Sequence, residues 1–170
     1  FEELPEDVRE KVKQNHAEMF GYRFSEETIA SLKALAEHFG GKLADWSMDF
    51  FGGSPSRAKF AMPDADEMSE AEIAHRLPAL GDFDEETGRG CGDCKLTGVC
   101  TDEDAIDGFR IAFRAGETDI NRLMQAAFKS LLKTALAECA DEYSDATFGE
   151  TCDANNYEFF ANGKLYHEKT

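Results

Sequence analysis

Three cysteines close together in the chain have the spacing best suited to chemistry. Cys91 and Cys94 are separated by two residues, and Cys100 follows six residues after Cys94. Thiolates at the spacing of Cys91 and Cys94 can bind one metal ion from the same side of a turn. The pattern therefore indicates half of a zinc site, with Cys100 as a third ligand.

The rest of such a zinc site would have to come from distant parts of the chain. A structural zinc site needs four ligands, and the sequence has no second closely spaced pair of cysteines. The alternative is that the cysteines are plain reduced thiols, since an odd number, five, does not fit a disulfide framework. Thiol redox chemistry is less favoured because acidic surroundings disfavour the thiolate. The residues that could complete a zinc site are Cys139, Cys152, His75 and His167.

No group of residues predicts an enzyme. The four histidines, at positions 16, 38, 75 and 167, are scattered, and none lies in a catalytic motif. Carboxylates are so abundant that two close together carry no information about acid and base roles. We therefore expect a protein without catalytic activity.

Acidic residues dominate the chain and are concentrated in its middle. The 170 residues include 35 acidic and 18 basic ones, and the net charge is -17. Between Asp64 and Asp107 lie fourteen acidic and three basic residues, a surplus of eleven out of the seventeen. Such a charge repels nucleic acid and anionic membranes and attracts basic partners. Charged runs are also common on solvated faces that only keep a protein soluble.

Apolar residues at helical spacing predict several helices. A stripe of apolar residues ends at Gly40-Gly41, and Ser69 with Glu72 forms a capping box ahead of Pro78. A much longer stripe in the second half of the chain continues for more than five turns. The expected helices span about 5–16, 25–39, 69–77, 118–139 and 144–155.

Alternating and aromatic segments predict a small sheet. Residues 43–51 and 57–62 are expected to pair as an antiparallel hairpin with a four-residue loop, and 94–100 and 109–114 read as two further strands. The sequence thus predicts an α+β fold, with a small antiparallel sheet against a long helix in the C-terminal half and further helices at the N-terminus. We expect one domain over 1–170, with an acidic, loop-rich insertion at about 64–107.

No apolar run is long enough for a membrane span, and no secretory leader opens the chain. These features favour a cytoplasmic protein. An overall apolar content of 42% favours a folded chain over a disordered one.

Three segments of the chain, two of them at its ends, carry recognisable motifs. They are the opening Phe1–Val12, a helix leading into the aromatic Trp46–Phe51, and the closing Asn155–Tyr166, with its Asn-Gly turn. In these segments the chain resembles a group of small phage and prophage proteins often labelled as antitoxins of a toxin–antitoxin stability system. The resemblance implies a mobile-element origin and an α+β fold, and it supplies no catalytic residues. Small acidic phage proteins are often inhibitors of host defence enzymes, including CRISPR effectors and restriction systems.

The leading hypothesis is a non-enzymatic anti-defence protein that is encoded by a phage or prophage and acts in the cytoplasm of the bacterial host. It would bind a basic nucleic-acid-binding surface of a host protein or nucleoprotein complex, without binding nucleic acid itself. A first alternative is an antitoxin-like module that sequesters a partner protein through Tyr157, Phe159, Phe160 and Tyr166. A second alternative is a small zinc-binding protein. The contact residues expected under the leading hypothesis are Asp64, Asp66, Glu67, Glu70, Glu72, Asp82, Asp84, Glu85 and Glu86.

Overall fold

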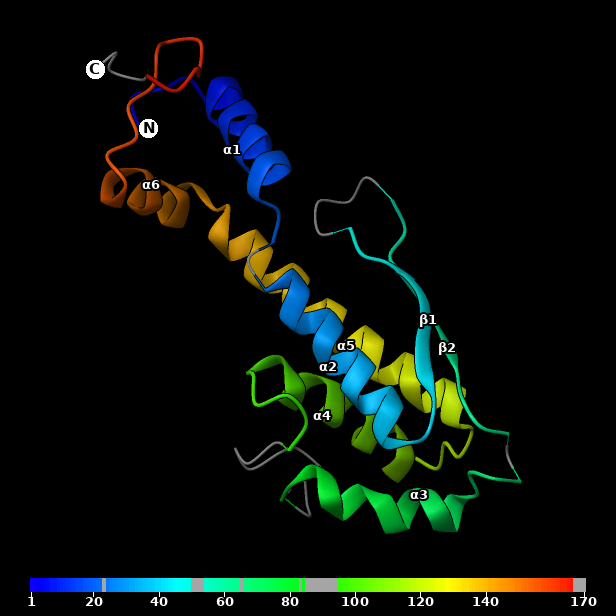
Figure 1. The fold of residues 1–170 in the computed structure, drawn as a ribbon. Coiled ribbons are helices and arrows are strands. Elements are labelled where there is room, and N and C mark those ends of the chain that lie inside the picture. Colours follow the sequence, from blue (N-terminus) through cyan, green and yellow to red (C-terminus); the bar gives the residue numbers. More distant parts are fainter. Residues whose placement is uncertain (23, 50–53, 65, 83, 85–94, 167–170) are drawn as a thin grey trace. The chain divides into compact units, whose positions relative to one another are not determined.

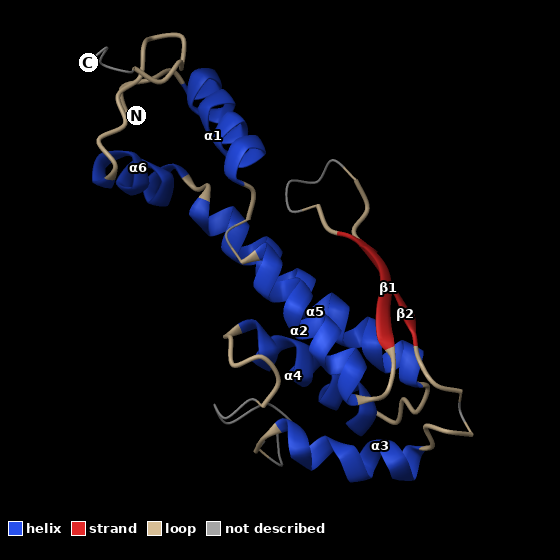
Figure 2. Cartoon of the chain, viewed as in Figure 1, coloured by secondary structure: helices blue, strands red, loops and turns tan. Residues whose placement is uncertain are grey.

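The structure is a computed structural model that describes residues 1–22, 24–49, 54–64, 66–82, 84 and 95–166. Within these residues there are six α-helices, one short 3₁₀ helix and a two-stranded antiparallel sheet (Figures 1 and 2), so the predicted α+β class is confirmed. The helices are α1 (Glu6–Phe20), α2 (Ser25–His38), α3 (Glu70–Arg76), η1 (Leu77–Leu80), α4 (Thr101–Arg114), α5 (Ile120–Glu142) and α6 (Asp145–Ala154), and the strands are β1 (Lys42–Ser47) and β2 (Arg57–Ala61).

The chain divides into two compact units. Unit 1 comprises Phe1–Arg23 and Leu136–Thr170, and unit 2 comprises Phe24–Ala135. The acidic stretch lies in unit 2, where the described part of 64–107 includes α3, η1 and the first half of α4. The expectation of a single domain with an insertion stays a prediction. Within the described residues, no helix combines the length and apolar character needed to cross a bilayer.

The core of unit 2 is built from one face of each of its helices. Leu32 and Leu35 of α2, Ile106 of α4 and Leu123 of α5 are fully buried. The rings of Phe39 and Phe109 stack at a centroid distance of 4.5 Å and an interplanar angle of 8°. Apolar burial of this kind supplies most of the free energy that holds a domain of this size together.

The hairpin pairs as predicted but with a longer connection. β1 and β2 are antiparallel, with an irregularity between Leu43 and Asp45. The strands end at Ser47 and resume at Arg57, so nine residues connect them where four were predicted. The backbone N–H of Asp49 donates to Ser56 Oγ at 2.9 Å, which closes the base of the loop. Gln125 of α5 donates to the Ala58 carbonyl at 2.8 Å, consistent with the predicted packing of the sheet on the long helix.

The prediction of two further strands, at 94–100 and 109–114, is wrong for the described residues. Residues 109–114 are the C-terminal half of α4, and described residues 95–100 form bends and a turn. Ala105, Ile106 and Phe109 are buried at helical spacing, whereas Ile111, which the alternating pattern placed on the same face as Phe109, is 44% exposed. The helical period therefore prevails over an alternation only six residues long.

Unit 1 packs α1 and α6 with the C-terminal segment. α1 begins after Pro5 as predicted but continues past His16 to Phe20, where Gly21 takes φ 67°. The buried residues at the centre of unit 1 are Val12, Phe148 and Cys152. Arg9 and Lys13 of α1 both pair with Asp145 at the start of α6, at 3.1 and 2.6 Å.

The C-terminal segment forms a tight turn against α1. Phe159 and Leu165 make an antiparallel bridge, and Gly163 in the turn between them has φ +78°. A Cβ at Gly163 would lie 2.9 Å from methyl groups of both Val8 and Val12. Only glycine fits both this backbone conformation and this close approach.

Candidate partner-binding site

The acidic residues predicted to contact a partner surround a helix that is firmly anchored. Ser69 caps α3 as predicted, because its Oγ accepts the Glu72 backbone N–H at 3.4 Å. On the opposite face, Ile73 and Leu80 are fully buried in the core of unit 2. Of the predicted contact residues, Glu70 and Glu72 therefore lie on an anchored helix, and Asp64, Asp66 and Glu67 lie in the segment just before it.

Most of the described candidates are exposed and lie at the two ends of the α3–η1 segment. Asp64, Asp66, Glu67 and Glu70 precede α3 or begin it, and Asp82 and Asp84 follow η1. From the rise of its turns, this segment separates the two groups by roughly 15–20 Å. Among the described residues, none of Asp64, Asp66, Glu67, Glu70 and Asp82 forms an ion pair.

The remaining candidates behave differently. Glu72 is half-buried, and its Oε1 lies 2.6 Å from Nε of Arg76, one turn further along α3. Its charge is thus compensated within the helix, which makes it the weakest of the described candidates. Glu85 and Glu86 lie outside the described residues.

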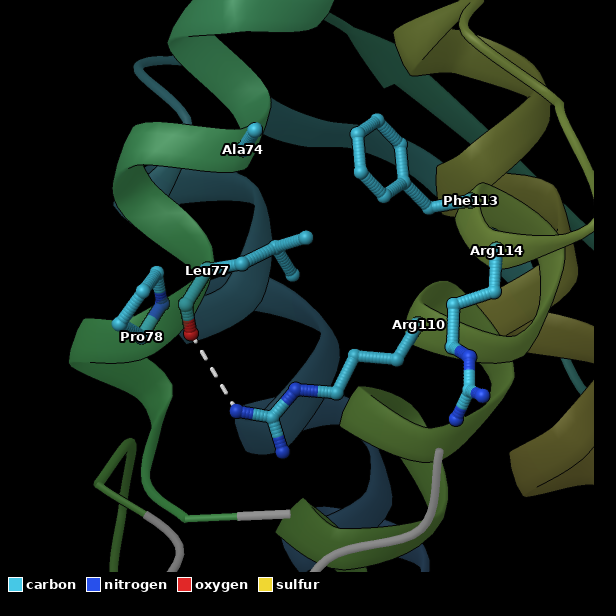
Figure 3. A pocket seen from close by; sticks show the side chains of 6 residues that line it. All are labelled: Ala74, Leu77, Pro78, Arg110, Phe113 and Arg114. Atoms are coloured by element: carbon cyan, nitrogen blue, oxygen red, sulfur yellow. Dashed lines mark hydrogen bonds between the residues drawn. The ribbon is translucent and has the colours of Figure 1, made fainter. Parts of the chain in front are cut away.

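A small apolar pocket lies between α3–η1 and α4, close to these acids. Its volume is about 220 Å³, and it is lined by Ala74, Leu77, Pro78, Arg110, Phe113 and Arg114 (Figure 3). The buried Arg110 donates through Nη2 to the carbonyls of Leu77, at 3.2 Å, and Gly81, at 2.6 Å. These two bonds fix the end of η1 and hence the direction in which the chain leaves toward Asp82.

Sequence reasoning missed the role of Arg110. The strand predicted at 109–114 includes this residue and gives it no structural role. The signal that could have found it is its helical spacing from Ile106, which puts a cation on the apolar face of α4. A cation there must be satisfied by carbonyl oxygens or carboxylates from the element that covers it.

The predicted metal ligands that the structure describes are divided between the two units. Cys91, Cys94 and His167 lie outside the described residues, and Cys100 and His75 are exposed in unit 2. Cys139 and Cys152 are buried in unit 1, where burial raises the pKa of the Cys139 thiol to about 11 and keeps it protonated. Within the described part of the chain, no three His, Cys, Asp or Glu side chains are grouped as metal ligands. Zinc binding stays a prediction.

The four tail aromatics divide into two inward and two outward residues. Tyr157 and Phe159 are half-buried against the core of unit 1. Phe160 and Tyr166 are 51% and 43% exposed and contact each other edge to face, at a centroid distance of 5.2 Å. Only the second pair is available to a partner without rearrangement.

His16 of unit 1 is a titratable group set among aromatic rings. Its Nδ1 lies 3.2 Å from the Tyr143 hydroxyl, and its ring centroid lies 4.5 Å from that of Phe20 and 5.1 Å from that of Phe148. Burial lowers the pKa of His16, and the nearby Glu142 carboxylate opposes this shift only in part. The neutral imidazole is therefore the form that the fold favours.

This arrangement predicts that the protein loses stability as the pH falls. The unfolded chain keeps the ordinary histidine pKa near 6.5, so it binds more protons at position 16 than the folded chain does below about that pH. The free energy of unfolding should therefore decrease from pH 7.5 toward pH 5, more steeply than in the variant His16→Gln. Thermal unfolding followed by circular dichroism measures this slope, with His75→Gln, at an exposed histidine, as the control. Equal slopes for His16→Gln and the unaltered protein would contradict the assignment.

In comparisons with known protein families, curated proteins and solved structures, nothing matches this chain.

Proposed function

We propose that this protein is a non-enzymatic inhibitor that binds a basic, nucleic-acid-binding surface of a host defence complex. The proposal is carried by exposed carboxylates at the two ends of α3–η1 that form no ion pair with another described residue, namely those of Asp64, Asp66, Glu67, Glu70 and Asp82. The phage-like segments at the ends of the chain favour a CRISPR effector or a restriction enzyme as the class of target.

The physical basis is that carboxylates can replace phosphates as ligands of arginine and lysine. Guanidinium and ammonium groups in a nucleic-acid channel form charge-assisted hydrogen bonds with either anion. The anchoring of α3 through Ser69, Ile73 and Leu80 fixes the backbone that carries Glu70 before binding, which lowers the entropy lost on association. The net charge of -17 adds long-range attraction to a basic channel and speeds encounter.

The test is a charge reversal at the first group of acids. Changing Asp64, Asp66, Glu67 and Glu70 to Lys is expected to weaken inhibition at least tenfold, because attraction across the interface becomes repulsion. Competition between the protein and target DNA is measured on a panel of purified CRISPR effectors and restriction enzymes, at low and at high salt. Inhibition should weaken as the salt concentration rises.

A matched control separates the site from the overall charge. Glu37, Asp141, Glu150 and Asp153 are exposed residues outside the acidic stretch. Changing these four to Lys alters the net charge by the same amount but should leave most of the inhibition. Equal losses in the two variants would argue against a localised site, and undiminished inhibition by the first variant would exclude these four acids.

A second candidate function, sequestration of a partner protein, is supported by the exposure of Phe160 and Tyr166. The same assay distinguishes it. If the double variant Phe160→Ser, Tyr166→Ser loses inhibition while the four-acid variant keeps it, the tail and not the acidic stretch holds the partner.

A further inference from the structure

Unit 1 contains a groove lined by apolar and basic residues, in a chain that is strongly acidic overall. It has a volume of about 500 Å³ and lies between α1, α6 and the C-terminal segment. Cavities that bind small molecules usually fall between about 300 and 1,000 Å³. Its apolar lining includes Met19, Phe20, Phe148, Tyr157, Phe159 and Leu165.

The mouth of the groove exposes large apolar side chains. Met19 is 76% exposed and Phe20 is 60% exposed, whereas Phe148 is almost completely buried. Contact between water and side chains of this size is unfavourable by roughly 1.5–3 kcal/mol each relative to burial. An apolar ligand in the groove would cover this surface.

The wall formed by the C-terminal segment is already in place. The backbone N–H of Phe160 donates to the Lys164 carbonyl at 2.9 Å, and that of Gly163 donates to the Phe160 carbonyl at 2.8 Å. Gly163 also packs closely on Val8 and Val12 of α1. A ligand would therefore meet a preformed wall and would not have to order it.

The charges in the lining of the groove are positive. Lys11 and Lys164 line it together with Asn15, His16 and Asn162, and no carboxylate is among the described residues that line it. Both lysines are exposed, and neither forms an ion pair with another described residue. Lys13, two residues from Lys11, is by contrast paired with Glu10 and Asp145. In a chain with 35 acidic residues, the lysine and aspartate or glutamate content of this lining is thus reversed, with two lysines and no carboxylate among its described residues.

We propose that the groove binds a small amphipathic carboxylate, a molecule with an alkyl or aryl body and one anionic end. The body lies against Phe20, Phe148 and Tyr157, and the carboxylate contacts the ammonium groups of Lys11 and Lys164. This site lies in unit 1, whereas the acids proposed to bind a defence complex lie in unit 2.

Two probes with the same tail and opposite charge test the proposal. Dodecanoate and dodecyltrimethylammonium are titrated into the full chain below their micelle concentrations, and binding is measured by calorimetry. The net charge of -17 favours the cation, whereas the mouth of the groove favours the anion. We expect dodecanoate to bind with one-to-one stoichiometry and more tightly than the cation. Equal or tighter binding of the cation would overturn the proposal.

Variants assign the binding to the groove. Changing Lys11 and Lys164 to Gln should weaken dodecanoate binding roughly tenfold for each lysine, because each removes a charge-assisted contact. The control pair Lys33→Gln, Lys133→Gln, at exposed lysines of unit 2, changes the net charge equally and should leave the affinity unchanged. Equal effects of the two pairs would overturn the assignment.

A change to the apolar mouth provides the second readout. Met19→Ser, Phe20→Ser replaces exposed side chains, so the fold should be retained, as circular dichroism can verify. This variant should bind dodecanoate at least tenfold more weakly. Unchanged affinity in the folded variant would show that the alkyl chain does not lie in this groove.

Discussion

Replacing Asp102 by alanine is expected to destabilise unit 2 by at least about 3 kcal/mol. Asp102 is fully buried at the start of α4, and its two oxygens accept four hydrogen bonds. Oδ1 accepts the hydroxyls of Ser31, at 2.6 Å, and Thr97, at 2.7 Å. Oδ2 accepts the backbone N–H groups of Thr97, at 2.7 Å, and Gly98, at 2.8 Å.

The expected loss is large because one carboxylate joins three segments. Ser31 belongs to α2, Thr97 and Gly98 to the turn before α4, and Asp102 to α4 itself. Ser31 Oγ also lies 2.7 Å from Thr101 Oγ1, which extends the network. Alanine would leave the buried Ser31 hydroxyl and the part-buried donors of Thr97 and Gly98 without this acceptor, and a buried donor left unpaired costs about 1–3 kcal/mol.

Two variants test whether the hydrogen bonds and not the negative charge are responsible. Asp102→Asn can keep its amide oxygen on the backbone N–H groups of Thr97 and Gly98 and donate its NH₂ to the hydroxyls of Ser31 and Thr97, which can also accept. It should therefore destabilise clearly less than alanine. Glu103→Ala removes an exposed carboxylate from the same turn and should cost less than about 1 kcal/mol, through the helix dipole alone.

Urea unfolding followed by the fluorescence of Trp46 measures these differences. Trp46 is the only tryptophan in the chain and lies on β1 of unit 2, so its signal reports on the unit that contains Asp102. A free energy of unfolding within about 0.5 kcal/mol of the unaltered protein would contradict the assigned role of Asp102.

Asp102 also shows where sequence reasoning ends. In the sequence it is one of fourteen acids between Asp64 and Asp107, and nothing distinguishes it from its neighbours. In the structure Asp102 is buried and accepts four hydrogen bonds, Glu72 pairs with Arg76, and Asp64 is exposed. These differences depend on which donors the tertiary fold brings close, and a count of charges contains no such information.

The elements that were predicted well have long or chemically specific signals. The apolar stripes of α2 and α5 each cover several turns, and Ser69 marks the start of α3 through a hydrogen bond between near neighbours. The strand predicted at 109–114 had only six residues of alternation to support it. A signal that short fits a helix and a strand equally well, and the packing of Ile106 and Phe109 decided between them.

The candidate sites follow the same division. The exposure of most of the acidic residues at the two ends of α3–η1 was predictable from their polarity. The spacing of Tyr157, Phe159 and Phe160 likewise indicates that the first two side chains point inward and the third outward. The groove of unit 1 was not predictable, because Lys11 and Lys164 are far apart in the chain. Only the close packing of Gly163 on α1 brings both lysines to one groove.

The second large effect is expected at Gly108, in the middle of α4. Gly108→Ala should destabilise unit 2 by about 2–3 kcal/mol, although alanine is the better helix former by about 1 kcal/mol. A Cβ at this position would lie 2.5 Å from Ser130 Cβ, 2.7 Å from the Ala126 carbonyl oxygen and 3.0 Å from Ala127 Cα, all on α5. Two of these three atoms belong to the backbone, so no change of rotamer relieves the overlap.

The substitution can be accommodated only if α4 and α5 move apart. That movement would loosen the contacts that bury Phe109, Leu123 and Leu131, and close-packed interiors tolerate such gaps poorly. Gly108→Val adds two more carbon atoms at the same contact and should cost more than alanine. The fluorescence of Trp46 during urea unfolding again measures the change.

Gly149 is the matched control because it is also a helical glycine but lacks the close neighbour. A Cβ there would lie 3.7 Å from Phe1 Cδ1, which is an ordinary van der Waals contact. Gly149→Ala should therefore stabilise α6 by up to about 1 kcal/mol, with thermal unfolding by circular dichroism as the measurement. The same substitution thus has opposite signs at the two positions. Stabilisation by Gly108→Ala would mean that α4 and α5 are not in the close contact from which the core of unit 2 is built.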